Sequence, residues 1–461
     1  MMAAAQAATA GNERPYLGTT GITLHQPKIN GLSRASRLNF ELLSTAQSLL
    51  YRKNLPTEAP RLSFEHETEA EQRGRQALEK THAYKRQFKQ HATCWCHRTV
   101  NSDSVHIKRK VDGSGARLAG IGTCGSVWTC PVCAAKITEA RRAELMEGMA
   151  RAKSIGLRPF LMTLTTPHGR GQALGELLPD FQKALTSFKN SKTFKAVSAQ
   201  MRRAGSVRSL EVTWGEENGW HPHTHDLVYV EGDLQAMLDW RLNADDPDST
   251  LRAAWFKALK KAKLASESQR EDVFEHGLDI RDGTYAAEYV AKFGREATSE
   301  GWGLSGELTK SHSKLGKRGQ RFTPFQLLQW AKTGDKRAAE LFVEFADAFT
   351  GKRMLSYSPK LKSKLEVGDI PDEVLASMET PMPEEESAGS LSVEDFHEVV
   401  KRGAVADLLD YAAACLNNPD TADDDLADWI EWLKQTPARY GGALRLRKHF
   451  GSGVMEIYGN A

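Results

Sequence analysis

The chain has 461 residues, of which 40% are hydrophobic and 26% charged, as in an ordinary soluble globular protein. This length allows one large domain or two to three smaller ones. No apolar run approaches the roughly 20 residues that are needed to cross a bilayer. The Ala-rich N-terminus lacks the basic start and the apolar core of a signal peptide. We therefore expect neither a membrane protein nor a secreted one.

The net charge of +3 and the pI of about 8.4 do not by themselves require a nucleic-acid partner. The distribution of charge is more informative, because basic clusters occur in the middle of the chain and acidic runs occupy 384–386 and 423–425. This arrangement suits a polyanion bound in the middle, although solvated surface charge explains any single cluster equally well. The candidate DNA contacts in the basic clusters are Lys108, Arg109, Lys110, Lys314, Lys317 and Arg318.

Composition and periodicity divide the chain into five expected parts. These are an N-terminal tail with helices (1–89), a cysteine-rich segment with a helix (90–155), a core of strands and helices (156–350), a linker (351–390) and an acidic helical module (391–461).

Five of the six cysteines fall within 94–133, and such clustering in a chain without a secretion signal indicates metal binding rather than disulfides. Cys130-Pro-Val-Cys133 is a Cys-x-x-Cys pair, whose two thiolates can close on one tetrahedral ion. The candidates for the remaining ligands are Cys94, Cys96, Cys124 and His97. We predict a structural Zn²⁺; reduced buried cysteines or a redox switch are the alternatives. The sixth cysteine, Cys415, is expected in the core of a helix.

The core is expected to alternate strands and helices. Helices are predicted over 134–153, 173–203, 232–243, 249–264, 283–293 and 324–348, and strands over 159–166, 207–214, 221–230 and 272–280. The strands at 207–214 and 221–230 are joined by a Gly- and Asn-containing link typical of a hairpin.

The second strand of this hairpin contains His221, His223 and His225 at alternating positions. Side chains at i and i+2 share a strand face, so the imidazoles project together. If the turn centres near Asn218, Glu211 on the first strand lies opposite His225. A His/His/Glu set with open positions suits Mg²⁺ or Mn²⁺, with His221 as a further ligand, a phosphate contact or a strand-entry residue. The alternative is a row of solvent-facing histidines.

The predicted helix at 283–293 places Tyr285, Tyr289 and Lys292 on one face by their i, i+4, i+7 spacing. A free phenol has a pKa near 10 and is a poor nucleophile. A nearby metal, or a cation such as Lys292, favours the phenolate. An amphipathic helix with two tyrosines is nevertheless usually structural.

In their order along the chain, these segments resemble the HUH endonuclease superfamily, and within it the rolling-circle replication initiator (Rep) proteins of bacterial plasmids. The resemblance spans about residues 90–330. Its motifs are Cys124-Gly-Ser-Val-Trp-Thr-Cys-Pro-Val-Cys133, Phe160-Leu-Met-Thr-Leu-Thr165 with Pro167-His-Gly-Arg-Gly171, Gly219-Trp-His-Pro-His-Thr-His225 and Tyr289-Val-Ala-Lys292. The chain departs from the family at Thr224, where a bulky hydrophobic residue is usual, and at Phe293, where some relatives have a second tyrosine.

The resemblance implies an α+β fold: an antiparallel HUH/RRM-like nuclease sheet with flanking helices, an N-terminal zinc-binding segment and a C-terminal helical module. It implies that a metal on His223 and His225 assists attack by Tyr289 on one DNA strand, leaving a 5′-phosphotyrosyl link and a free 3′-OH primer. Lys292 would steady the phosphate or the phenolate, Tyr285 is a candidate helper, and Glu288 is a candidate for activating water.

The implied partners are origin DNA, single-stranded or extruded as a hairpin, and the host replication machinery in the bacterial cytoplasm. Because the sequence lacks a nucleotide-binding P-loop, unwinding is expected from a host helicase. The alternatives are an HUH transposase acting on transposon ends and a catalytically inert, zinc-stabilised DNA-binding regulator.

Overall fold

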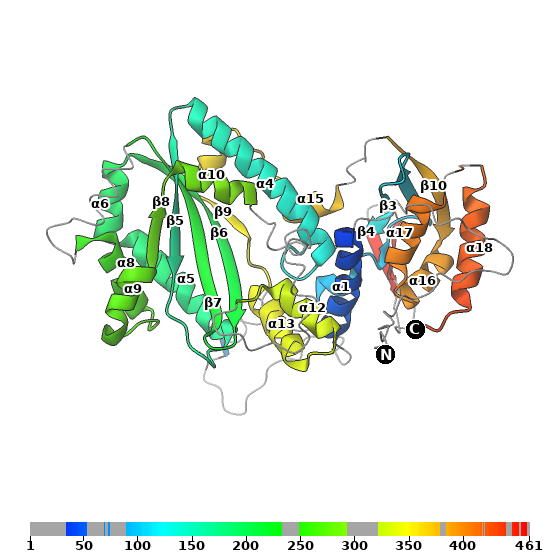
Figure 1. Cartoon of the computed structure of the whole chain (residues 1–461), viewed down its shortest axis with the longest axis horizontal. Coiled ribbons are helices and arrows are strands. Elements are labelled where there is room, and N and C mark those ends of the chain that lie inside the picture. Colours follow the sequence, from blue (N-terminus) through cyan, green and yellow to red (C-terminus); the bar gives the residue numbers. More distant parts are fainter. Residues whose placement is uncertain are drawn as a thin grey trace, which may run out of the picture.

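A computed structural model of the chain describes residues 34–52, 69, 72–73, 89–232, 249–292, 321–378, 384–416, 418, 420–438, 445–450 and 453–458 (Figure 1). The described residues form a larger unit around a five-stranded sheet and a smaller unit around a three-stranded sheet. The helix α1 (Arg34–Leu50) lies between them and contacts elements of both. Within these ranges no helix combines the length and the apolar character that a membrane span needs.

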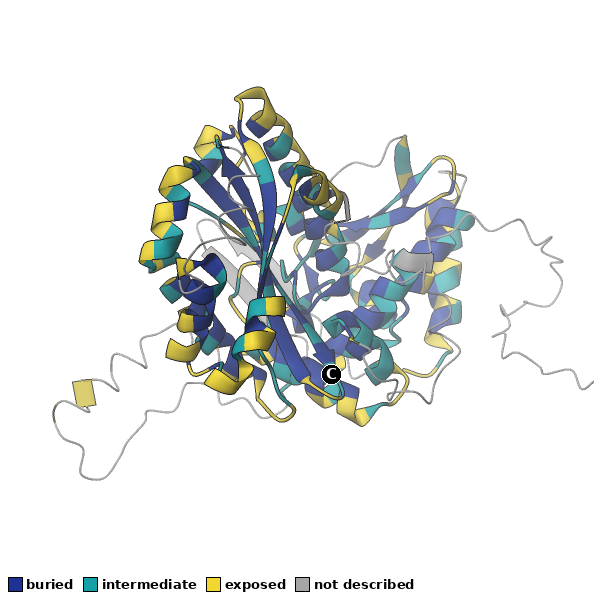
Figure 2. Cartoon of the chain, turned by 60° about the vertical axis from the view of Figure 1, so that its left-hand side comes forward, coloured by how far each residue is buried: buried dark blue, intermediate teal, exposed yellow. Residues whose placement is uncertain are grey.

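The larger sheet has the strand order β8-β5-β7-β6-β9, and every neighbouring pair in it is antiparallel. Its strands are β5 (Arg158–Thr165), β6 (Arg203–Gly215), β7 (Gly219–Val230), β8 (Leu278–Arg281) and β9 (Leu355–Tyr357). Figure 2 shows these strands buried along most of their length, with exposed residues on the outer faces of the helices. The predicted α+β class with an antiparallel sheet is confirmed, and so is the hairpin of β6 and β7.

Helices cover both faces of this sheet. On one face, α10 (Gly283–Lys292) reaches the sheet through Tyr289, which contacts Glu211 of β6. On the other, α5 (Leu174–Asn190) places Lys189 beside the buried Asp226 of β7. The other helices of this unit are α4 (Pro131–Ser154), α6 (Lys192–Gln200), α8 (Leu251–Lys261), η3 (Glu267–Gln269), α9 (Arg270–His276), α12 (Pro324–Lys332), α13 (Lys336–Phe349), α14 (Leu361–Lys364) and α15 (Asp372–Ser377).

Several predicted elements differ from the observed ones for local reasons. The helix predicted over 173–203 breaks at Ser191, whose hydroxyl accepts a hydrogen bond from the Phe194 N–H and begins α6. The strand predicted over 272–280 is mostly the helix α9, which has Glu271 and Asp272 in its first turn, where acidic side chains stabilise a helix. The helix predicted over 232–243 lies outside the described residues.

The smaller unit has the strand order β10-β2-β3, again antiparallel. Its own core includes Val105, Ile107, Phe396 and Leu408. It comprises β2 (Ser104–Lys110), β3 (Ala116–Ala119), β10 (Glu385–Ser392), α16 (Val393–Lys401), α17 (Val405–Ala414) and α18 (Ala422–Lys434). The described part of the predicted C-terminal module is helical over 393–434 and forms strands further on, and the smaller unit also takes in a hairpin from the cysteine-rich region.

The boundaries expected around this unit were wrong. The hairpin of β2 and β3 interrupts the cysteine-rich segment and packs on helices that lie about 300 residues further along the chain. A two-stranded hairpin is marginal by itself, so it gains stability by pairing with β10 and covering the helices. The expected linker at 351–390 contains β9, α14, α15 and the start of β10, with Leu361, Leu365 and Ala376 buried.

A third, small sheet has the order β12-β11-β1-β4. It consists of β1 (Thr99–Val100), β4 (Ile121–Gly122), β11 (Arg445–Phe450) and β12 (Gly453–Tyr458), and η1 (Ala92–Trp95) precedes it. The strands β1 and β4 hold the two ends of the inserted hairpin together, which keeps the cysteines on either side of it close in space.

Candidate active site

The hairpin of β6 and β7 sets the register of the candidate site. Glu211 pairs with His223, and Ser209 pairs with His225. The sequence prediction placed Glu211 opposite His225, which was wrong by two residues. The pairing of Gly215 with Gly219 centres the turn on residue 217 rather than 218. A shift of the turn centre by one residue changes the residue opposite Glu211 by two. Glu211 therefore still lies on the same sheet face as the histidines, because side chains two residues apart on a strand share a face.

The structure brings Glu211, His223 and His225 together as a three-ligand group. One ligand atom from each lies within 4.8 Å of the others. The Glu211 Oε2 atom is 3.4 Å from His223 Nε2 and 3.7 Å from His225 Nε2. Burial opposes ionisation of this carboxyl, but the two imidazoles outweigh it and lower the pKa of Glu211 to about 2. The group therefore combines an ionised carboxylate with two imidazoles.

The two histidines are oriented by contacts on their other ring nitrogens. His225 Nδ1 is 2.9 Å from the Thr163 hydroxyl on β5, and His223 Nδ1 is 3.2 Å from the His221 carbonyl oxygen. Both contacts leave Nε2 facing Glu211. Such outer contacts position ligating histidines and raise their basicity. Burial lowers the pKa of His225, which favours the neutral ring that can offer a lone pair to a metal.

His221 lies outside the three-ligand group. It is buried, its Nδ1 accepts a hydrogen bond from the Arg321 guanidinium at 2.8 Å, and its Nε2 donates to the Thr165 hydroxyl at 2.9 Å. Burial and the neighbouring His223, His168 and Arg321 lower the pKa of His221 to about 2. Both ring nitrogens are thus engaged. Arg321 was not among the residues predicted for the site, so its position beside His221 was missed.

Tyr289 is the tyrosine that reaches the group. Its hydroxyl donates a hydrogen bond of 2.8 Å to Glu211 Oε1, and its ring centroid lies 4.8 Å from that of His225. The buried Ala286 and Val290 on the neighbouring face of α10 hold the helix against the sheet. Burial, followed by the charge of Glu211, raises the pKa of Tyr289 well above its usual value. The phenol is therefore protonated in the absence of an added cation.

The other residues predicted on this helix lie differently. Tyr285 is 51% exposed, and the Arg281 guanidinium lies 5.2 Å from its ring centroid. Glu288 is exposed as well. We expected the two phenols to lie together at the site. In the structure only Tyr289 faces the sheet, and Tyr285 faces the solvent. The proposed helper roles of Tyr285 and Glu288 stay predictions, and the Lys292 side chain lies outside the described residues.

Four cysteines form a second candidate metal group. One sulfur from each of Cys96, Cys124, Cys130 and Cys133 lies within 4.8 Å of the others. The sulfur of Cys96 is 3.5 Å from those of Cys130 and Cys133. Hydrogen bonds from neighbouring thiols, that of Cys124 first, hold the pKa of the Cys133 thiol well below its usual value. Cys133 lies in the first turn of α4, where backbone N–H groups favour a thiolate.

Two further cysteines fall outside this group. Cys94, a predicted zinc ligand, lies instead against α1, with its sulfur 3.9 Å from the Gln47 carbonyl oxygen. Burial raises the pKa of Cys94 to about 11, so it is a neutral thiol. Cys415 was expected in a helix core, but it is exposed at the end of α17.

The basic residues predicted to contact DNA are only partly described. Arg109 was a wrong prediction, since it is 4% exposed, donates a 2.8 Å hydrogen bond to the Leu416 carbonyl oxygen and pairs with Glu386. It therefore holds the smaller unit together. Its neighbours Lys108 and Lys110 are partly exposed. The remaining candidates, Lys314, Lys317 and Arg318, lie outside the described residues.

Comparison with known proteins shows that the chain is similar to replication proteins. Residues 116–236 match the model of the replication protein family. The protein named "Protein rep" of Streptomyces lividans is 27% identical over 269 residues, which cover 49% of this chain and 57% of the relative. The "Neomycin resistance protein" of Streptomyces cyanogenus is 26% identical over 157 residues, covering 29% and 36%. The predicted resemblance to plasmid Rep proteins is confirmed.

The matched segment includes three of the four grouped cysteines and the whole His/His/Glu group. It contains Cys124, Cys130 and Cys133, as well as Glu211 and the two histidines, and it ends before Tyr289. The chain spans little more than half of the first relative and about a third of the second. No solved structure matches the chain.

Proposed function

We propose that this protein initiates rolling-circle replication of a plasmid by nicking and rejoining one DNA strand at the origin. Tyr289 is the proposed nucleophile, and Glu211, His223 and His225 are the proposed ligands of a divalent metal. The observation that carries the proposal is the 2.8 Å hydrogen bond from the Tyr289 hydroxyl to the Glu211 carboxylate, within the His/His/Glu group. The phenol of Tyr289 is thus in direct contact with a group of side chains that could bind a metal.

The donor set fits Mg²⁺ or Mn²⁺. The carboxylate is a ligand typical of Mg²⁺ and Mn²⁺, and the imidazoles favour a transition ion such as Mn²⁺ over Mg²⁺. Three protein ligands leave positions open for phosphate and water. All three residues are partly rather than fully buried, so a substrate can approach them. A bound divalent ion supplies charge stabilisation at the scissile phosphate.

Tyr289 and Glu211 together provide the nucleophilic step. The phenol oxygen forms a bond to the scissile phosphorus, and the bond from phosphorus to the 3′ oxygen breaks. The phenol proton has an acceptor in Glu211 at 2.8 Å, a distance suited to general base catalysis. The products are a 5′-phosphotyrosyl link and a 3′ oxygen that takes up a proton. The reverse attack by a 3′-OH rejoins the strand without ATP, because the covalent link conserves the phosphodiester bond energy.

The four-cysteine group has a different proposed role. Four thiols, from the residue after η1, the 124–130 loop and the start of α4, fit the closed, tetrahedral set of a structural Zn²⁺. From this group α4 runs to β5 and α10 and contacts both. A zinc ion there would stabilise α4, which packs against the helix that carries Tyr289. Origin DNA is the proposed substrate, with a host helicase and the replication machinery as partners in the bacterial cytoplasm.

The decisive experiment uses a supercoiled plasmid with the cognate origin, Mn²⁺ or Mg²⁺, and the full-length protein. The unaltered protein should give nicked circles with protein attached to the 5′ end, and Tyr289→Phe should abolish both. Tyr285→Phe is the matched control, and it should retain the adduct. An adduct that survives Tyr289→Phe but not Tyr285→Phe would make the nucleophile assignment wrong. Origin binding without any metal-dependent nicking would instead support an inert DNA-binding regulator.

A further inference from the structure

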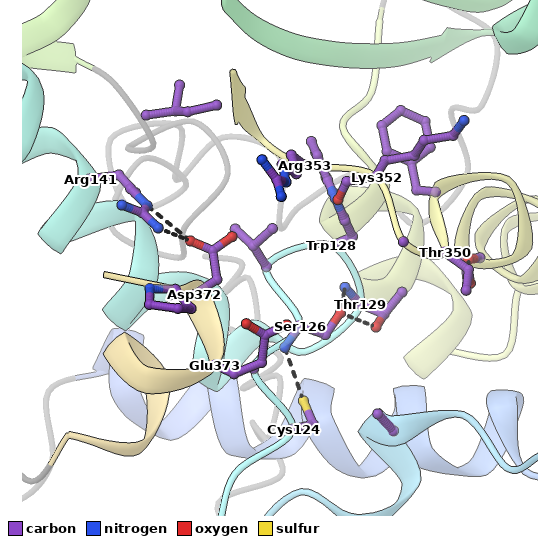
Figure 3. A pocket seen from close by; sticks show the side chains of 18 of the residues that line it. Cys124, Ser126, Trp128, Thr129, Arg141, Thr350, Lys352, Arg353, Asp372 and Glu373 are labelled. Carbon is purple, nitrogen blue, oxygen red and sulfur yellow. Dashed lines mark hydrogen bonds and ion pairs between the residues drawn. The ribbon is translucent and has the colours of Figure 1, made fainter. Parts of the chain in front are cut away.

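A large cleft lies outside the nuclease group, between the 124–129 loop, α4, the end of α13 and β9 (Figure 3). Its volume is about 1250 Å³. Small-molecule sites occupy roughly 300–1,000 Å³, so the cleft is larger than a typical small-molecule site. Cys124 of the four-cysteine group lies at its edge, where its sulfur accepts from the Ser126 N–H. No part of the proposed nicking step uses this space.

Positive charge predominates on the cleft walls. The basic side chains are Arg52, Lys89, Arg141, Lys352, Arg353, Lys360 and Lys362, and the acidic ones are Asp347, Asp369, Asp372 and Glu373. Three of the acids are paired within the cleft: Asp372 with Arg141 at 2.6 Å, Asp347 with Arg52 at 2.9 Å and Asp369 with Lys362 at 2.8 Å. Arg353 and Lys360 are exposed and form no ion pair with any carboxylate in the described parts of the chain. The cleft therefore favours an anionic ligand.

Aromatic rings stand beside these cations. Trp128 is partly exposed in the cleft, where its indole N–H donates to the Lys352 carbonyl oxygen at 2.8 Å and Phe349 supports its ring edge-on at 4.7 Å. Figure 3 shows Trp128 next to Lys352 and Arg353 on one side of the cleft. Cations that track a backbone, next to rings on which bases stack, are the features that bind single-stranded nucleic acid.

One residue that lines the cleft lies at a strand position on the same sheet face as the metal group. Leu355 of β9 lines the cleft and pairs with Ser209, which in turn pairs with His225. Residues directly opposite each other on neighbouring strands point to the same face. With a spacing of about 4.8 Å between strands, Leu355 and His225 lie about 10 Å apart across the sheet. A strand in the cleft would thus be within a few nucleotides of Tyr289.

We propose that this cleft binds a single-stranded DNA segment adjoining the scissile phosphate. Arg353 and Lys360 contact its phosphates, and Trp128 stacks on one of its bases. The proposal rests on the proposed function for the identity of the strand, but the binding itself requires no cleavage. Single-stranded DNA is proposed in preference to duplex DNA because stacked, paired bases offer no free face to Trp128.

The test measures binding of a fluorescent oligothymidylate of about 15 nucleotides, a length in the range of known single-strand sites. The full-length Tyr289→Phe protein is used so that no covalent adduct forms, and anisotropy is recorded at several salt concentrations. The double variant Arg353→Glu/Lys360→Glu is compared with Lys192→Glu/Lys195→Glu, the same charge change on exposed residues of α6, which lies at the far end of the larger unit (Figure 1). Zinc content and thermal unfolding confirm that each variant is folded.

We expect the cleft variant to bind at least about tenfold more weakly and to lose about 1.4 from the slope of log affinity against log salt, since each single-strand phosphate contact contributes about 0.7. The α6 variant should stay within about twofold. Equal losses in both variants, or an unchanged slope in the cleft variant, would overturn the proposal. The proposal would also be overturned if a duplex of the same length bound as tightly and lost the same affinity in the Arg353→Glu/Lys360→Glu variant. If the unaltered protein fails to nick while the cleft dependence holds, the proposed nuclease function fails and the cleft assignment stands.

Discussion

The two candidate metal groups of this chain differ in every property that decides what a metal site can do. The four-cysteine group offers four soft ligands, three of them fully buried, at the start of a long helix. The His/His/Glu group offers three harder ligands that are partly exposed on a sheet face, next to a tyrosine. A closed set of four satisfies a zinc ion and leaves no position for substrate, whereas an open set of three leaves room for chemistry.

Their support differs as well. The cysteine group joins segments on both sides of an inserted hairpin, where a bound ion would add to the β1–β4 pairing in holding them together. The His/His/Glu group lies on strands that pair along twelve registered positions of one hairpin, which needs no ion to form. The first group should therefore control folding and the second activity, and each of the following substitutions tests that separation.

The largest effect is expected for Cys133→Ser. Loss of one thiolate should remove the zinc ion, and structural zinc contributes about 10–16 kcal/mol of binding free energy to such folds. Zinc content should fall from about one ion per chain to near zero, and thermal unfolding should lose its cooperativity. The matched control is Cys94→Ser, which should keep its zinc because Cys94 lies against α1. Equal zinc loss in both variants would contradict the four-cysteine assignment.

A smaller effect is expected for Glu211→Gln. This change keeps the shape of the side chain but removes the charge that would hold the divalent ion and accept the phenol proton. Nicking should fall by about 10²–10⁴-fold, the range for a lost acid–base group, while zinc content stays unchanged. Glu217→Gln, in the turn of the same hairpin, should nick at the normal rate. If Glu211→Gln also loses zinc or unfolds, the two groups are not independent.

The smallest effect is expected for Thr163→Val. The Thr163 hydroxyl contacts His225 Nδ1 at 2.9 Å, and such outer contacts typically change metal affinity or activity by 10–100-fold. Titration with Mn²⁺ should show weaker binding in this variant. Thr213→Val makes the same change on β6, where the hydroxyl is buried and has no hydrogen-bond partner among the described residues. Equal Mn²⁺ affinities in the two variants would show that the Thr163 hydroxyl does not support metal binding by His225.

The parts of the site that could be predicted depend on short-range periodicity. The alternation of His221, His223 and His225 placed them on one strand face whatever the register. Glu211 joined them despite an error of one position in the turn, because such an error moves the partner by two and keeps the face. On α10 the spacing related Tyr285 to Tyr289 but could not orient the helix, which depends on how Ala286 and Val290 pack on the larger unit.

The parts that could not be predicted depend on contacts between distant segments. Nothing near Arg109 indicates that its guanidinium would be buried against Leu416 and Glu386. The choice of Cys96 over Cys94 follows from the η1 turn, which directs one sulfur to Cys130 and Cys133 and the other to α1. Strand β10, expected as part of a linker, is defined by its pairing with β2.

The amino-acid sequence by itself determined the two ligand sets in outline, the hairpin that carries the histidines and the helix that carries the tyrosines. Each of these follows from spacing within a few residues, where the geometry of a strand, a helix or a Cys-x-x-Cys turn leaves little freedom. Only the tertiary structure decided that Tyr289 meets Glu211 from 78 residues away, that His221 lies outside the group and that Cys96, not Cys94, joins the other three cysteines. Those outcomes depend on which buried surfaces pack together, and burial is a property of the whole chain.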